Sequence, residues 1–492
     1  MGSPVSIPFK SFIQVDRTSS NAIYMQIVNQ LIHAIQRGAL PPGTKLPGTR
    51  ALSELLDTHR NTAVAVYEEL SAQGWIEIRP NQGTFIASQL PNLEKGAKTT
   101  KKYANTTGFS FEKSNLLDNP YEYTKCDHIF TDGTPDIRLT QVSDLSGFYS
   151  SNMKRKSNLR KMNWYNHDGS EYFKQQLARY LHLSRGLNIS TDNLLITRSA
   201  EMSLFIISEI LLRKDDAVVV GMPGNFSANM VFQKTGARIY TIPVDQEGLD
   251  THALLELCKK MRVRMVYVTP HHHYPTTVSL SAPRRMQLLQ LAREYGFIIV
   301  EDDYDYDFQY DKKPLLPLAS VDDQGMVIYV GSFGKSLAPG FRTGFVVSPA
   351  NLMKEMRKYL GIIDRQGDIV MEQVLGEMIE EGAIHRHLNK SLKVYKARRD
   401  TMADGLTRAF GNKLTFTVPS GGLALWATWK YPVNLLKLSQ EASKQGLFIP
   451  KTLLYQDRKL TAMRIGFGHL DETEIGKSLE ILKSTFSSMQ AK

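Results

Sequence analysis

The first ninety residues carry apolar side chains at the spacing of amphipathic helices. Steps of about four residues predict a helix from Asn21 onward, which Gly38 and the pair Pro41–Pro42 would end. Two further patterns predict helices from about Thr49 and from about Arg60. The apolar positions of the three helices are Ile23, Ile27, Leu31 and Ile35, then Leu52, Leu55 and Leu56, then Val64, Tyr67 and Leu70.

A strand–turn–strand pattern follows the third helix. The segment WIEIRPNQGTFIA (75–87) places apolar residues on both sides of a turn at 80–83. Three helices that end in a hairpin predict a winged helix-turn-helix, an α+β module, over residues 1–88. Such a module places one helix in the major groove of DNA and the hairpin beside it.

The pattern changes twice more along the chain. Residues 89–127 are polar, rich in Lys and weakly periodic, which predicts a linker. From 128 to 492, short apolar runs such as LLIT and AVVVG alternate with amphipathic stretches. Nearly continuous apolar runs are typical of strands buried on both faces, so the chain is predicted to be multi-domain, with a C-terminal α/β domain built on a mainly parallel sheet.

The composition is that of an ordinary globular protein, with 42% hydrophobic and 22% charged residues. The N-terminal residues lack the apolar core of a signal peptide, and no stretch approaches the ~20 apolar residues that span a bilayer. The two cysteines, Cys126 and Cys258, are too few for a disulfide framework. We therefore expect a cytoplasmic protein with no membrane partner, and the net charge of +11 favours polyanionic partners.

The start of the third helix is the candidate DNA-reading surface of the head. Arg60, Asn61 and Thr62 stand there, and Arg and Asn side chains can pair with the edges of guanine and adenine. Arg50 opens the second helix, where a phosphate is readily held, and Gly83 lies at the tip of the hairpin. The alternative is a small domain of the same shape that binds protein.

The segments YMQIVNQLIHAIQRGALPPGTKLPGTRALSELL (24–56) and HRNTAVAVYEELSAQGWIEIRPNQGTFIA (59–87) resemble the GntR family of bacterial regulators. The resemblance covers nearly the whole head. It implies that double-stranded DNA is the partner and that Arg50, Arg60, Thr62 and Gly83 lie near it. One departure is Gly48, where the family often has Ser.

Two segments of the C-terminal domain carry the side chains that pyridoxal 5'-phosphate (PLP) requires: IIVEDDYDYDFQY (298–310) and VIYVGSFGKSLAPGFRTGFVV (327–347). PLP needs a lysine amine for a Schiff base, a carboxylate against its ring nitrogen and donors for its phosphate. Lys335 follows a strand, and Asp302 stands where a parallel strand ends and ligands bind. Tyr304 is expected on the side of Asp302, near the phenolic oxygen of the ring, while Ser332 and Arg342 are candidates for the phosphate.

Other interpretations of these segments remain open. The acidic run 301–307 is also typical of a solvated loop or of a divalent-metal site. Three adjacent histidines at 271–273 cannot all face one point on a strand, so we predict no metal site. A basic run at 154–161 is either a solvated helix face or an additional contact with DNA.

The C-terminal domain resembles fold-type I aminotransferases over roughly residues 130–485, and more closely the MocR/GabR-type regulators, which fuse a GntR-type head to such a domain. Beside the two segments above, the motifs that carry the resemblance are YNHDGSEYFKQQLARYL (165–181), ITRSAEMSLFII (196–207), PGNF (223–226), VTPHHHYPTT (268–277) and AMRIGFGHL (462–470).

The resemblance implies the fold-type I PLP-dependent transferase fold, PLP as cofactor and a head-to-tail homodimer. It also implies a phosphate-binding turn at Ser199 and Ala200, a partner-chain tyrosine at Tyr165 and an effector-carboxylate arginine at Arg464. The chain departs from the family at Arg198–Ala200, where Ser-Gly-Thr is usual, at Asn225, where an aromatic residue is usual, and at His273–Pro275.

These observations predict a PLP-dependent transcription regulator that senses an amine, an amino acid or PLP itself and controls metabolic genes at promoters with paired half-sites. The alternative is an active aminotransferase with an appended N-terminal domain, since Lys335 can also move the proton in transamination. A third possibility is a DNA-binding protein whose C-terminal domain holds no cofactor. The sequence leaves open whether weak transaminase activity is retained.

Overall fold

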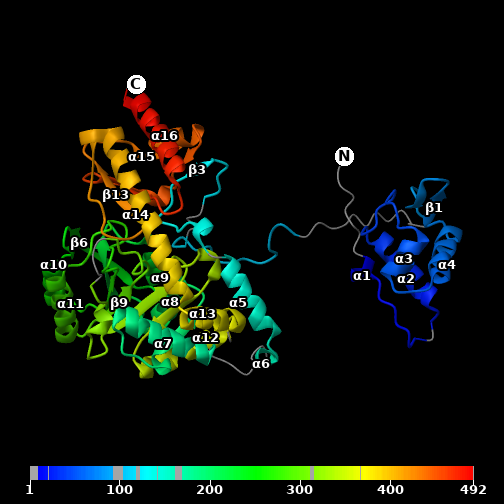
Figure 1. Cartoon of the computed structure of the whole chain (residues 1–492), viewed down its shortest axis with the longest axis horizontal. Coiled ribbons are helices and arrows are strands. Elements are labelled where there is room, and N and C mark those ends of the chain that lie inside the picture. The colour runs from blue at the N-terminus through cyan, green and yellow to red at the C-terminus, as the bar shows by residue number, and fades with distance from the viewer. Residues whose placement is uncertain are drawn as a thin grey trace. The chain divides into compact units, whose positions relative to one another are not determined.

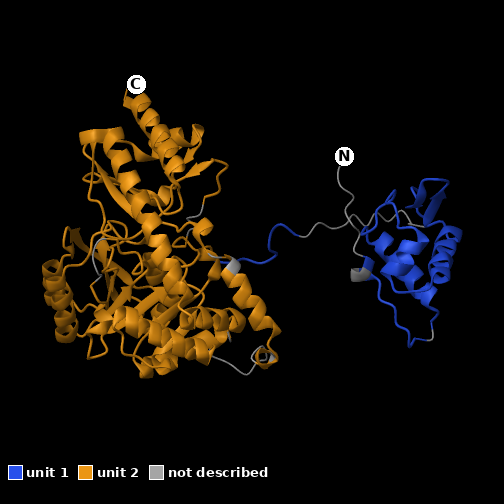
Figure 2. Ribbon diagram, viewed as in Figure 1, with its two compact units in different colours: residues 1–112 blue, residues 113–492 orange. Residues whose placement is uncertain are grey.

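The computed structural model describes residues 9–19, 21–91, 104–117, 122–140, 142–160, 169–310, 315–365 and 367–490. The chain divides into two compact units, residues 1–112 and residues 113–492 (Figure 2). We call them the head and the body and describe each by itself. The finer boundaries at residues 88 and 127 remain predictions.

The head is a winged helix, as its sequence predicts. Its two strands pair antiparallel, with Ile76 opposite Ile86 and Arg79 opposite Gly83, and Lys45 forms a bridge to Phe85 at the edge of this hairpin. The helices bury their apolar faces in one core with the base of the hairpin. The elements are α1 (Phe9–Phe12), α2 (Ile23–Gln36), α3 (Thr49–Leu55), α4 (Arg60–Ala72), β1 (Ile76–Arg79) and β2 (Gly83–Ile86).

The body is built on an eight-stranded sheet in the order β4-β11-β10-β9-β8-β5-β6-β7. The central strands run parallel, whereas β11 and β7 run antiparallel to their neighbours, so the prediction of a mainly parallel sheet is confirmed. The strands are β4 (Leu194–Thr197), β5 (Ala217–Met222), β6 (Arg238–Asp245), β7 (Gly248–Leu249), β8 (Met265–Val268), β9 (Ile298–Asp302), β10 (Val327–Ser332) and β11 (Gly344–Val347).

Helices cover both faces of this sheet because alternate strand residues point to opposite sides. Val218 and Val220 of β5 pack with α8, α9 and α12, whereas Val219 packs with α10 and α11 (Figure 1). Helices α7 and α13 cover the β4 end of that second face. The helices are α5 (Val142–Lys154), α6 (Lys156–Leu159), α7 (Glu171–Arg185), α8 (Ala200–Leu211), α9 (Phe226–Lys234), α10 (Thr251–Lys260), α11 (Ala282–Tyr295), α12 (Ala350–Ile363) and α13 (Ile369–Glu380).

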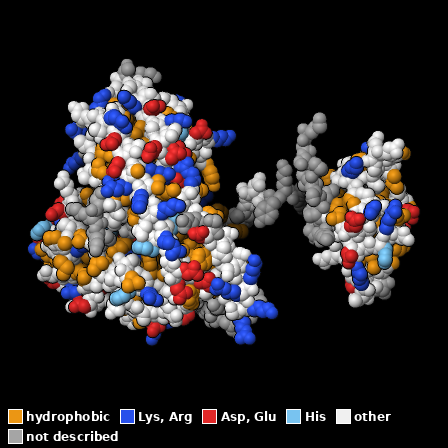
Figure 3. Space-filling model, in the orientation of Figure 1, with side chains coloured by type: hydrophobic (Ala, Val, Ile, Leu, Met, Phe, Trp, Pro, Cys, Tyr) orange, Lys and Arg blue, Asp and Glu red, His pale blue; other side chains and the backbone are white. Residues whose placement is uncertain are grey.

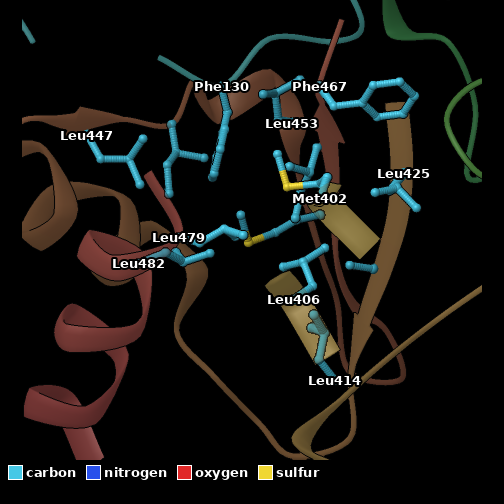
Figure 4. Packing of buried hydrophobic residues seen from close by; sticks show 14 of the residues in the cluster. Phe130, Met402, Leu406, Leu414, Leu425, Leu447, Leu453, Phe467, Leu479 and Leu482 are labelled. Carbon is cyan, nitrogen blue, oxygen red and sulfur yellow. The ribbon is translucent and has the colours of Figure 1, made fainter. Parts of the chain in front are cut away.

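A second, antiparallel sheet of four strands, in the order β12-β13-β16-β15, forms the C-terminal part of the body. Its core joins Leu425, Met402 and Leu479 from a strand and two helices (Figure 4). Strand β3 (His128–Ile129) pairs with β14 (Leu447–Phe448) beside it. The other elements are α14 (Ala383–Phe410), β12 (Leu414–Phe416), β13 (Ala424–Trp429), α15 (Leu435–Lys444), β15 (Leu454–Gln456), β16 (Thr461–Gly466) and α16 (Glu472–Gln490).

Candidate cofactor and DNA sites

A cavity of about 280 Å³ opens at the edge where the parallel strands of the large sheet end. Strands β9 and β10 end there at Asp302 and Ser332, and α8 begins there after β4. Residues 132–135 close the cavity from the C-terminal part of the body. The lining residues are Asp132, Thr134, Pro135, Arg198, Ser199, Ala200, Glu201, Asn225, Tyr274, Asp302, Tyr304, Ser332, Gly334, Lys335, Pro339, Arg342 and Thr343.

Lys335 stands in the turn that follows β10, and its side chain is partly buried against the cavity. Its Nζ lies 4.6 Å from the centre of the Tyr304 ring. Burial lowers the pKa of the Lys335 amine below its usual value, and the Asp132 carboxylate is the strongest of the charges that oppose this lowering. A lysine amine of lowered pKa is more often unprotonated, which is the nucleophilic form.

Asp302 ends β9 and is 5% exposed. The Tyr267 hydroxyl donates a 2.7 Å hydrogen bond to Oδ2 of Asp302, while Oδ1 has no partner among the described residues. Burial raises the pKa of this carboxyl to about 7 against the opposing effect of the Tyr267 hydrogen bond. A buried acceptor without a partner is costly, so Oδ1 is suited to a cationic ring N–H of a ligand.

The start of α8 also lines the cavity. The Ser199 side chain caps the helix by accepting from the Met202 N–H at 3.3 Å, and Ala200 is the first helical residue. A helix N-terminus attracts a phosphate, and Ser332 and Arg342 line the same cavity. Arg342 has no ion pair with a described residue, and its left-handed backbone (φ +46°) follows the short turn at 339–341. These groups fit a phosphate dianion.

Arg198 also lines the cavity, but its charge is already paired. Its Nε donates to Oδ2 of Asp364 at 2.6 Å. The Arg198 guanidinium is therefore engaged by an aspartate of the protein.

The predicted residues Tyr304 and Arg464 both donate hydrogen bonds to backbone carbonyls of the protein. The Tyr304 hydroxyl donates to the His272 carbonyl at 2.8 Å. Arg464, on β16, is 1% exposed and is not among the residues that line the cavity. Its Nε and Nη1 donate to the carbonyls of Asp132 and Pro275, each at 2.8 Å.

The acidic run after β9 is buried rather than solvated. Asp303 lies 3.0 Å from Nδ1 of His271, and Asp305 lies 2.8 Å from Nδ1 of His272. His273 faces elsewhere, with its Nε2 2.9 Å from the Pro223 carbonyl. Asp303 and Asp305 thus each pair with one of the three histidines. No group of described residues has the arrangement of a metal site.

The predicted site residues do not include Asn225 and Asp132, which line the cavity, or Tyr267, which contacts Asp302. Asn225 caps α9 and donates to the Tyr267 hydroxyl at 3.3 Å, which extends the hydrogen-bond chain to Asp302. Asp132 places a carboxylate in the cavity wall. Asn225 could have been found from the sequence, because an aromatic residue is usual in the family at this position. Tyr267 has no such signal, because its sequence context is that of an ordinary strand residue. The predicted Tyr165 lies outside the described residues.

The head presents its predicted DNA-contact residues on its surface. Arg60 and Asn61 begin α4 and are exposed, and Thr62 is half-buried. Arg50 is exposed on α3, where its Nε lies 3.6 Å from Glu54. Gly83 follows the hairpin turn with φ +114°, a conformation that disfavours other residues.

Two further basic residues, which were not predicted, lie at the hairpin: Arg79 on β1 and Lys45, which forms a bridge to β2. The Arg79 guanidinium lies 4.7 Å and the Lys45 amine 5.7 Å from the centre of the Phe85 ring. In the body, Lys154, Arg155, Lys156 and Arg160 of the predicted basic run are exposed, and Figure 3 shows Lys and Arg side chains gathered over α5 and α6. Arg155 is ion-paired with Glu377, which favours a solvated, partly structural helix face.

Comparison with known families agrees with this architecture. The model of the aminotransferase class I and II family matches residues 153–479, more than half of the chain, and that of the bacterial regulatory proteins of the gntR family matches residues 23–86. The chain therefore belongs to the aminotransferase class I and II family and carries a GntR-type DNA-binding head.

Relatives with both parts cover almost the whole chain. The probable rhizopine catabolism regulatory protein MocR of Rhizobium meliloti is 26% identical over 483 residues, 97% of this chain and 96% of the relative. The uncharacterized HTH-type transcriptional regulator YdeL of Bacillus subtilis is 26% identical over 485 residues, 96% and 98% of the two chains. The Pyrococcus horikoshii kynurenine aminotransferase, solved in complex with PMP, has 26% identity and a TM-score of 0.67 over 73% of this chain and 91% of its own.

The protein is thus a transcription regulator of the MocR type, with a DNA-binding winged helix and an aminotransferase-like body whose cofactor is PLP. This confirms the predicted fold, cofactor and function class. The active aminotransferase with an appended domain is not favoured, because regulators match the chain from end to end. No helix of the described residues is long and apolar enough to cross a membrane.

Proposed function

We propose that the body senses an amine or an amino acid in the Lys335 cavity and that ligand binding changes the affinity of the head for DNA. The carrying observation is that Lys335 and the unpartnered Oδ1 of Asp302 line one cavity with the start of α8. When bound there, PLP supplies an aldehyde carbon that condenses reversibly with primary amines.

Each part of the cavity has a role toward this cofactor. Lys335 is the resident amine, and its lowered pKa keeps the amine available as a nucleophile. Asp302 holds the proton of the ring nitrogen through Oδ1, and Tyr267 fixes the orientation of its carboxylate. The phosphate is held at Ser199 and Ala200, with Ser332 and Arg342 as side-chain donors.

Residues of the head read the promoter. Arg60, Asn61 and Thr62 contact base edges, while Arg50 and the backbone at Gly83 contact phosphates. A homodimer places two heads on paired half-sites, and in a head-to-tail arrangement Tyr165 of the partner subunit completes each cavity. Because the target is DNA, the protein acts in the cytoplasm, on the promoters of metabolic genes.

Sensing requires the ligand to bind one arrangement of the protein better than another. The test measures the affinity for labelled promoter DNA by fluorescence anisotropy, with and without amines. It compares the PLP-loaded full chain with the Lys335→Ala variant. We expect an amine to change the DNA affinity of the natural chain and not that of Lys335→Ala. Equal responses of the two proteins would contradict the proposal, and steady turnover of amino-acid and oxo-acid pairs would favour an enzyme.

A further inference from the structure

Ser336, the residue directly after Lys335, is buried outside the cavity. It is 5% exposed and is not among the lining residues. Its hydroxyl donates a 2.5 Å hydrogen bond to Oδ2 of Asp307. The turn that contains both residues is closed by a 3.0 Å hydrogen bond from the Leu337 N–H to the Phe333 carbonyl, and these two side chains are buried in the core. The turn that carries Lys335 is thus held on the side away from the cavity.

Asp307, the acceptor of this hydrogen bond, is itself fixed by α7. Its Oδ1 accepts from Nη2 of Arg185 at 3.1 Å and from the Tyr180 hydroxyl at 3.2 Å. The Arg185 guanidinium also donates to the Tyr329 hydroxyl on β10 at 2.8 Å and lies 4.5 Å from the centre of the Tyr306 ring. Because a buried ion pair with several hydrogen bonds has little freedom to move, Asp307 is a rigid anchor.

One short segment, residues 302–307, connects this anchor to the other end of the cofactor site. The segment leaves β9 at Asp302, whose free Oδ1 lines the cavity, and it ends at Asp307. Between them, Tyr304 places its ring 4.6 Å from Nζ of Lys335. The segment therefore fixes the carboxylate for the ring nitrogen directly and the lysine turn through Ser336. Two groups that react with each other gain most when their relative position is set in advance.

We propose that Ser336 is a positioning residue, whose hydrogen bond to Asp307 holds the Lys335 amine where it meets the aldehyde carbon of PLP. This rests on the proposed function and adds a residue to the same site. In the step that Ser336 assists, the Lys335 nitrogen bonds to the aldehyde carbon, and the aldehyde oxygen leaves as water with the two amine hydrogens. Ser336 touches neither the cofactor nor the moving protons. Without its hydrogen bond the lysine turn gains freedom, which the covalent bond must then overcome.

The test compares two forms of the cofactor that differ in their reactive group. PLP bonds to Lys335, whereas pyridoxamine 5'-phosphate (PMP) carries an amine in place of the aldehyde and forms no bond with a lysine. Titration calorimetry with the cofactor-free full chain gives the Kd of each. Ser336→Ala should raise the Kd of PLP about tenfold and leave that of PMP within about twofold. A merely structural role of Ser336 would weaken the binding of both forms.

Two further variants assign the effect to one hydrogen bond. Ser184→Ala removes another hydroxyl of the same network, which lies 2.9 Å from Nη1 of Arg185 and does not line the cavity, and it should change neither Kd. Asp307→Asn weakens the Ser336 hydrogen bond from its acceptor end and should reproduce the selective loss of PLP affinity. Because both substitutions break one interaction, combining Asp307→Asn with Ser336→Ala should cost no more than about twofold beyond the more damaging single variant.

The outcomes separate this inference from the proposed function. Unchanged PLP affinity in Ser336→Ala, or equal losses for PLP and PMP, would overturn the inference alone. Losses that add up in the double variant, or an equal loss in Ser184→Ala, would also overturn it. If the natural chain binds PLP no more tightly than Lys335→Ala does, the proposed function itself fails.

Discussion

The hydroxyl of Tyr267 donates a 2.7 Å hydrogen bond to Oδ2 of Asp302 and leaves Oδ1 of the same buried carboxylate without a partner. The protein thus fixes Oδ2 by a hydrogen bond, whereas Oδ1 is left to accept a hydrogen bond from a ligand. Without a cation beside it, the carboxylate is poorly solvated, so the pKa of Asp302 rises to about 7 because of burial. The stability of the body should therefore depend on pH.

We predict that the cofactor-free protein loses stability as the pH rises from about 4 to about 7. The folded pKa of Asp302 is raised above its ordinary value of 3.8, so in this range the native state keeps a proton that the unfolded chain has lost. Asp302→Asn should reduce the dependence of the unfolding free energy on pH by up to about 1.4 kcal/mol per pH unit. Urea unfolding at several pH values measures it.

Part of the slope should survive in Asp302→Asn, because burial also raises the pKa of Glu301 and of Glu372 to about 7. PLP loading should act in the same direction as the substitution, since a protonated ring nitrogen favours the Asp302 carboxylate. An identical slope in the natural chain and in Asp302→Asn would show that Asp302 is not the responsible group.

Arg60→Ala should weaken specific promoter binding by about 1–3 kcal/mol. Arg60 is the exposed first residue of α4 and forms no ion pair with a described residue, so its loss should hardly change the stability of the head. Arg37→Ala is the matched control, since Arg37 is an exposed arginine that caps the C-terminus of α2. If both variants lose affinity equally, the effect is one of total charge rather than of base contact.

Arg464 and Arg342 should respond differently to truncation. Arg464→Ala leaves the carbonyls of Asp132 and Pro275 without donors, so the cofactor-free body should lose at least about 2 kcal/mol of stability. Arg342→Ala should leave this stability nearly unchanged and weaken PLP retention instead, because the Arg342 side chain lines the cavity and has no ion pair with a described residue. Equal stability losses would contradict this division, and PLP titration of both variants measures the retention.

The core of the C-terminal part of the body offers a further comparison. Leu406→Ala removes a fully buried side chain and should cost about 2–5 kcal/mol (Figure 4). Leu183→Ala truncates a leucine that is 76% exposed on α7 and should cost little. Urea unfolding measures the stability of the two variants. Similar urea midpoints would contradict the packing of Leu406 on α14 in the core.

The sequence predicted those features that depend on local pattern. The three helices and the hairpin of the head follow from apolar spacing and turn residues, and the strand ends at Asp302 and Ser332 follow from buried runs. The roles of the site residues stay predictions. Short elements escaped prediction, because β12 and β15, with three residues each, carry too little periodicity to identify a second sheet.

The sequence also did not predict contacts between segments that lie far apart in the chain. Tyr267 and Asp302 are 35 residues apart and lie on neighbouring strands whose order is a property of the folded sheet. The position of Arg464 depends on the Tyr274 ring and on the carbonyls of Asp132 and Pro275, which come from two loops far apart in the sequence. The sequence contains these residues but not their pairing.

The most direct measurement is reduction of the PLP-loaded full chain with borohydride, followed by mass spectrometry of its peptides. The cofactor should be found on Lys335 alone, and Lys335→Ala should carry none. A tag on another lysine, or no tag on a protein that retains its promoter affinity, would show that the body does not hold PLP as described.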